Sequence, residues 1–189
     1  MTLTRSIRPV GERRIHVIDG LFDAGFVSLL ATWIETLTFG RTDYDAPGLE
    51  QYRHFKREIP LDALDSHPLY RQLAHTVIAE TETHYNAYAP QLTRAYVNLV
   101  VYGDHHSAHY DTERGVTAIY YANPEWLDEW HGETLFYAHK EPVTAVAPRP
   151  GRLALLPADM THRVGNLSRL CNAARYTVAF KFETAETTE

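Results

Sequence analysis

The hydrophobic residues of the first 90 positions recur at helical spacing in two places. Residues 21–37 have apolar side chains three or four positions apart, and residues 66–88 repeat this period. Between these runs, residues 40–60 are punctuated by Gly, Pro and Asp and are typical of a loop with one extended piece. The pattern predicts a helical N-terminal support region over residues 1–90.

After Pro90 the period changes to two, and β-branched and aromatic residues become frequent. Six runs have this character: residues 94–103, 115–123, 133–138, 143–148, 152–157 and 175–182. No helical pattern alternates with them, which argues against a parallel Rossmann-type sheet. The order of elements predicts a mostly β fold, an antiparallel sandwich or jelly roll with N-terminal helices packed on one side.

The length of 189 residues suits a single domain, residues 1–189, with a β core over 91–183 and a flexible tail over 184–189. Apolar residues make up 44% and charged residues 22%, values that allow a real core.

The net charge of −6 argues against nucleic acid as a partner, because phosphate contacts need clustered Lys and Arg. Two short basic stretches, residues 5–14 and 52–58, are interpreted as solvated surface. The single cysteine, Cys171, allows no internal disulfide, and no apolar run is long enough to span a membrane. We therefore expect a cytoplasmic protein without a membrane partner; the oligomeric state stays open.

A His-x-Asp triplet precedes the second of the strand-like runs. His109 and Asp111 lie two positions apart, so on a strand their side chains point to the same side. Together with one more imidazole they would form the facial triad that binds Fe(II) and leaves positions open. His162, 53 residues after His109 and just after a strand ending at Pro157, is the candidate third ligand, since a jelly roll brings distant strands together.

Two other pairs share this spacing, His131/Glu133 and His139/Glu141, but neither has an obvious third ligand. The triplet could also be an ordinary hydrogen-bonded surface pair, so the remainder of the chain has to decide.

Four stretches of the chain, spread over residues 94–182, resemble the 2-oxoglutarate and Fe(II)-dependent oxygenases, in particular their prolyl-4-hydroxylase-like branch. These are "HYD", "AIYYANPEWLDEWHGETLFY", "GRLALLPADMTHRVGN" and "RYTVAFKF". The resemblance implies a double-stranded β-helix, a jelly-roll or cupin-like core. It also implies Fe(II), 2-oxoglutarate and O₂ as cofactors, with ascorbate as a further possibility.

By the same resemblance, His109, Asp111 and His162 match the iron ligands. Arg175 matches the basic residue that pairs with the distal carboxylate of 2-oxoglutarate, a role suited to the two-pronged guanidinium. Arg169, in the lengthened loop before Arg175, is a competitor for this role.

Three further residues are candidates for binding the cosubstrate. Tyr121 matches a family tyrosine that donates its hydroxyl to the same carboxylate, and Tyr102 and Thr177 are additional candidates. The family often has two glycines where this chain has one, Gly132, flanked by His131 and Glu133.

The resemblance implies a dioxygenase that hydroxylates an unactivated C–H bond and converts 2-oxoglutarate to succinate. We expect a small amino-acid-like substrate, with a peptidyl-prolyl hydroxylase as the alternative and a non-catalytic cupin-like sensor as the alternative of another class. Candidate substrate-binding residues near the mouth of the site are Asn98, His106, Tyr110 and Trp130.

Overall fold

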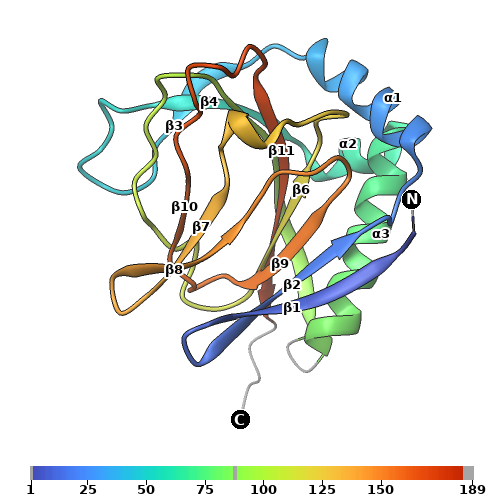
Figure 1. Cartoon of the computed structure of the whole chain (residues 1–189). Helices are drawn as coiled ribbons and strands as arrows, with labels where there is room; N and C mark the ends of the chain where they lie inside the picture. The colour runs from blue at the N-terminus through green and yellow to red at the C-terminus, as the bar shows by residue number, and fades with distance from the viewer. Residues whose placement is uncertain (1, 87–88, 185–189) are drawn as a thin grey trace.

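Eight strands form the larger of two antiparallel sheets in the computed structural model, which describes residues 2–86 and 89–184 (Figure 1). The strands are β1 (Thr4–Val10), β2 (Arg13–Asp19), β3 (Gly40–Asp43), β4 (His54–Ile59), β5 (Pro90–Val100), β6 (Val116–Tyr121), β9 (Leu153–Pro157) and β11 (Arg175–Thr184). Their order is β1-β2-β9-β6-β11-β5-β4-β3, so the last strand of the chain lies near the middle of the sheet.

The smaller sheet has three strands, β7 (Thr134–Ala138), β8 (Glu141–Val146) and β10 (His162–Val164), in the order β10-β7-β8. A short 3₁₀ helix, η2 (Asp128–Trp130), precedes β7. Helices α1 (Ala24–Glu35), α2 (Leu61–Ser66) and α3 (Pro68–Tyr85) cover one face of the larger sheet (Figure 1). This arrangement confirms the expected double-stranded β-helix with helices on one side.

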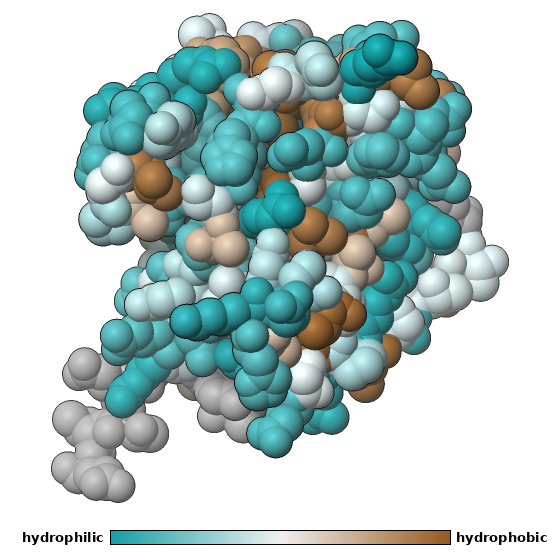
Figure 2. Space-filling model, turned by 60° about the vertical axis from the view of Figure 1, so that its left-hand side comes forward, coloured by the Kyte–Doolittle hydropathy of each residue, from teal (hydrophilic) through white to brown (hydrophobic). Residues whose placement is uncertain are grey.

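The two-residue alternation of β6 divides the interior into two cores. Val116, Ala118 and Tyr120 belong to the apolar core between the larger sheet and the helices. Ile119 and Tyr121 belong to the core between the two sheets. On the face shown in Figure 2 the surface is mostly hydrophilic, with hydrophobic residues in small separate groups. The site described below lies within the sandwich, on the side of the larger sheet away from the helices.

The N-terminal region is less helical than its pattern predicts. Strands β1 and β2 form a hairpin at one edge of the larger sheet, and β3 and β4 form the other edge. The basic stretch 52–58 is also not simply solvated surface, because His54 and Lys56 within it are buried. Hairpins at sheet edges have weak patterns, since one of their faces meets solvent or a polar pocket.

Several boundaries also differ from the expectation. The second predicted helix corresponds to α3, which begins at Pro68, and its expected end at Tyr88 lies outside the described residues. The short helix α2 before it was not predicted. Strand β10, only three residues long, was not predicted. Thr184 closes β11 and is not part of a tail, and residues 185–189 lie outside the described residues. Within the described part of the chain, no helix is both long and apolar enough to cross a membrane.

Phe180 lies at the centre of the interface between β11 and the helices and is fully buried. We expect Phe180→Ala to lower the free energy of unfolding by about 3–5 kcal/mol, because it removes buried surface and leaves a cavity. Leu29→Ala, on the exposed side of α1, is the control and should change it by less than about 0.5 kcal/mol. Urea unfolding curves measure both, and equal losses would contradict this description of the core.

Candidate active site

A pocket of about 180 Å³ opens between the two sheets and is lined mainly by polar and charged side chains. Strand β11 supplies one wall through alternate residues, Arg175, Thr177, Ala179 and Lys181, while Val178, Phe180 and Phe182 of the same strand face the helices. Because side chains alternate along β11, one set of them lines the pocket and the other set packs in the apolar core.

His109, Asp111 and His162 meet at one end of this pocket. Nε2 of His109 lies 3.9 Å from one Asp111 carboxylate oxygen, and Nε2 of His162 lies 3.8 Å from the other. The two histidines are held side by side by a backbone bridge, in which each N–H donates to the carbonyl of the other residue at 3.0 and 2.8 Å. The amide of Asp111 donates to Ala158 O at 2.9 Å, which joins the same two loops again. The three potential ligand atoms are thus positioned by backbone pairing.

The tautomers of both histidines suit metal binding. Nδ1 of His109 lies 3.0 Å from Ser107 O, and Nδ1 of His162 lies 2.9 Å from Met160 O. Because a carbonyl oxygen only accepts, each Nδ1 carries the proton and each Nε2 keeps its lone pair toward Asp111. Burial lowers the pKa of His162 to about 4, so its imidazole is neutral at neutral pH, as a ligand must be.

Asp111 is kept ionised by its neighbours. Burial would raise its pKa, but the charge of Lys181 and the nearby His162 hold the pKa well below its usual range. Nζ of Lys181 and Oγ1 of Thr117 each lie 2.5 Å from Asp111 Oδ2. Two donors therefore fix the carboxylate, an arrangement that orients metal-binding carboxylates in proteins.

Arg175 lies at the start of β11 and is only 1% exposed. Nη2 donates to Thr134 Oγ1 at 3.2 Å, and the guanidinium lies over the Tyr121 ring, 5.1 Å from its centroid. Nε has no hydrogen-bond partner, and among the described residues no carboxylate forms an ion pair with the group. A buried guanidinium without an anion is costly, so the site is complementary to a carboxylate supplied by a ligand.

The other residues predicted to bind the cosubstrate differ in their position relative to the pocket. Thr177 lines the pocket, and Tyr121 lies behind Arg175 with its hydroxyl 2.7 Å from Thr134 Oγ1. Tyr102 is 62% exposed and is not brought to the pocket, because β5 ends at Val100 and its alternation does not reach Tyr102.

Of the predicted substrate residues, Asn98, His106 and Tyr110 line the pocket. Trp130 does not, because it belongs to η2, where its ring packs edge-on against Trp126 with centroids 5.2 Å apart. The roles of the three lining residues stay predictions.

The alternatives left open by the sequence are not supported by the geometry. In the described part of the chain, neither His131/Glu133 nor His139/Glu141 joins a group of three side chains able to hold a metal. Arg169 is exposed, whereas Arg175 is buried beside the pocket.

Several residues of the site were not predicted, among them Lys181, Thr117, Asp45 and His54. Lys181 could have been found by following the alternation of the last strand from Arg175. Thr117 could have been found in the same way, because it lies on the same face of β6 as Tyr121. Asp45 and His54 lie within residues 40–60, which the sequence predicts as a loop with one extended piece, so only the three-dimensional structure brings them to the pocket.

Residues 97–182 match the family model described as the 2OG-Fe(II) oxygenase superfamily, and this segment contains all three candidate ligands and Arg175. The chain carries a 2OG-Fe(II) oxygenase domain. The enzyme is accordingly a 2-oxoglutarate-dependent dioxygenase, which sets aside the non-catalytic sensor. No curated protein matches the sequence.

Solved structures of several oxygenases have the same fold. A prolyl hydroxylase from Trichoplax adhaerens, in complex with a peptide of hypoxia inducible factor, has a TM-score of 0.69 at 18% identity and covers 90% of this chain and 83% of its own. A Pseudomonas putida prolyl-4-hydroxylase has a TM-score of 0.66 at 17% identity, with 92% and 94% covered. HygX from Streptomyces hygroscopicus, with nickel and 2-oxoglutarate bound, has a TM-score of 0.61 at 16% identity, with 91% and 83% covered.

The residues of this oxygenase domain fit its two cofactors. Two imidazoles and a carboxylate are a donor set suited to Fe(II), and the unpaired guanidinium of Arg175 suits the distal carboxylate of 2-oxoglutarate.

If His109, Asp111 and His162 hold the iron, His162→Ala removes one of three protein ligands. We expect the purified variant to retain one fewer Fe(II) per chain than the wild type and to lose 2-oxoglutarate turnover. Metal analysis after gel filtration and succinate release measure these effects. Wild-type iron content together with wild-type turnover would refute the assignment.

Arg175→Ala should raise the 2-oxoglutarate KM at least a hundredfold, from a loss of about 3–5 kcal/mol for an unpaired buried carboxylate. Arg175→Lys should lie between the wild type and the Ala variant, because it keeps the charge and loses the fork. Iron binding should be unchanged in both. Arg169→Ala, at an exposed position, is the control; a raised KM in that variant with none in Arg175→Ala would transfer the role to Arg169.

Proposed function

We propose that this oxygenase hydroxylates an unactivated C–H bond of a small amino-acid-like molecule. The observation that carries the proposal is the pocket itself, which measures about 180 Å³ and has charges of both signs in its lining. Asp43 and Arg94 both line the pocket, where Asp43 pairs with Lys56 and Arg94 pairs with Glu58. A zwitterionic small molecule has the complementary ammonium and carboxylate groups.

In the proposed reaction, His109, Asp111 and His162 hold Fe(II), while Arg175 and Thr134 anchor the distal carboxylate of 2-oxoglutarate. Bound Fe(II), with 2-oxoglutarate and O₂, supplies the oxidising chemistry that converts R–H to R–OH and 2-oxoglutarate to succinate and CO₂. The contribution of the protein is orientation, because the position of the substrate in the pocket selects the C–H bond. Lys181 and Thr117 keep Asp111 ionised and fixed throughout.

The carboxylate of Asp111 also bears on the type of reaction. Halogenases related to the family lack this carboxylate, and a halide binds the iron in its place. With Asp111 as the proposed iron ligand, the expected products carry oxygen from O₂ or a new unsaturation, and no chlorinated product should form.

A second candidate is hydroxylation of prolyl residues in a peptide. One of the structurally similar proteins is a prolyl hydroxylase in complex with a peptide fragment, which supports this alternative equally at the level of the fold. The two candidates differ in the substrate that must reach the same pocket.

A substrate panel tests the proposal directly. With Fe(II), 2-oxoglutarate and isotopically labelled O₂, a free amino acid or related small molecule should increase succinate release and gain one labelled oxygen atom by mass spectrometry. Preferential turnover of proline-containing peptides would instead establish the second candidate, and a chlorinated product would refute both.

A matched pair of arginine variants separates substrate binding from cosubstrate binding. Arg94→Gln, which changes the pocket lining, should raise the KM for the small molecule about tenfold and leave the 2-oxoglutarate KM unchanged. Arg53→Gln, an exposed position outside the lining, should change neither value.

A further inference from the structure

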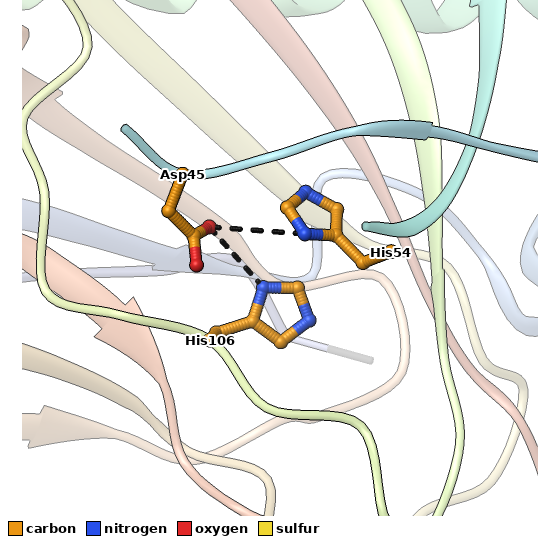
Figure 3. A group of neighbouring side chains, drawn as sticks. All are labelled: Asp45, His54 and His106. Atoms are coloured by element: carbon orange, nitrogen blue, oxygen red, sulfur yellow. Dashed lines mark ion pairs between the residues drawn. The ribbon is translucent and has the colours of Figure 1, made fainter. Parts of the chain in front are cut away.

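We propose that Asp45, His54 and His106 form a second binding site for a divalent first-row metal ion, separate from the family triad. The three side chains come from three parts of the chain: Asp45 follows β3, His54 begins β4, and His106 lies in the connection between β5 and β6. Both imidazoles turn a nitrogen toward the same carboxylate (Figure 3).

The spacing of the ligand atoms fits an ion between them. Asp45 Oδ1 lies 3.9 Å from His54 Nδ1 and 3.5 Å from His106 Nδ1, and one ligand atom from each residue lies within 4.8 Å of the others. Ligands about 2.1 Å from a tetrahedral zinc ion are about 3.4 Å apart, so small adjustments would suffice. The same distances are too long for good hydrogen bonds, which argues against a network that is complete without an ion.

Burial and charge point to the same conclusion. The side chains of Asp45, His54 and His106 are only 6–7% exposed. Among the described residues, no Lys or Arg pairs with Asp45, so its buried carboxylate lacks a permanent cation. Nδ1 of His54, one of the proposed ligand atoms, has no hydrogen-bond partner. Burial also lowers the pKa of His106, which favours the neutral imidazole that a metal requires.

An outer hydrogen bond holds Asp45 in place, as in established metal sites. Oδ2 of Asp45 accepts a hydrogen bond from the Ser107 amide at 2.6 Å, which leaves Oδ1 for the ion. Nε2 of His54 lies 3.7 Å from Asp43 Oδ2, so a carboxylate faces the nitrogen opposite the proposed ion. Two neutral nitrogens and one carboxylate oxygen suit Zn²⁺, Co²⁺ or Fe²⁺.

An ion at this site would join the β3–β4 side of the pocket to the loop that carries His109 and Asp111. Asp45 Oδ1 lies 3.5 Å from Nδ1 of His109, so the second site adjoins the first on the side away from Asp111. The ion would act as a structural clamp on the pocket wall. The proposal concerns metal binding alone and does not depend on the proposed substrate.

The test is metal stoichiometry of the full chain, measured by titrating metal-free protein with Co²⁺ and Zn²⁺ and analysing bound metal. We expect two ions per wild-type chain. Asp45→Asn, which keeps the shape of the side chain, and His54→Gln should each bind one ion. His162→Ala should also bind one, and the double variant His54→Gln/His162→Ala should bind none.

His105→Gln is the matched control, because His105 is the exposed neighbour of His106 and should leave two ions bound. Thermal unfolding gives an independent readout: Zn²⁺ should raise the melting temperature of His162→Ala and leave that of the double variant unchanged. If His54→Gln fails to fold, Asp45→Asn and His106→Gln replace it, and each should bind one ion where the wild type binds two. A single ion per wild-type chain, or two ions retained in Asp45→Asn, would overturn the proposal, as would a second dissociation constant weaker than about 1 mM.

Discussion

Strand β11 is covered on both faces, and the two-residue alternation of its side chains is the constraint on which the rest of the structure depends. One face packs Phe180 and Phe182 against the core under the helices, and the other presents Arg175 and Lys181 to the pocket. A shift of one residue in its pairing with β5 and β6 would exchange these faces. It would bury two cations in an apolar core and leave the pocket without its basic residues. The fold and the site therefore specify the same register.

The pocket contains several buried charges, and each depends on a partner that the fold or a ligand supplies. Asp111 has Lys181 and Thr117, so its charge is stabilised within the protein. Among the described residues, Arg175 contacts the neutral oxygen of Thr134 and the ring of Tyr121 and pairs with no carboxylate. Because a buried charge is expensive when it is unpaired, this difference marks Asp111 as positioned from within and Arg175 as reserved for an anionic ligand.

The backbone bridge between His109 and His162 explains how ligands 53 residues apart in the sequence can be held closely together. It ties the loop before β6 to the short strand β10, and the same loop carries His106 into the neighbouring cluster with Asp45 and His54. One loop thus contributes to both groups of candidate metal-binding side chains.

The sequence by itself predicted most of the strands after Pro90, the jelly-roll class and the three residues of the candidate metal triad. These follow from local signals: the change of period after Pro90, the His-x-Asp spacing, and motifs that occur in a recognisable order. The position of Lys181 could also have been inferred, because it lies on the same side of the last strand as Arg175. Only the tertiary structure decided that Tyr102 and Trp130 lie outside the pocket. It also decided that Asp45 and His54 meet His106 beside it. Local periodicity reports which face a side chain takes, whereas the packing of distant segments decides which faces meet.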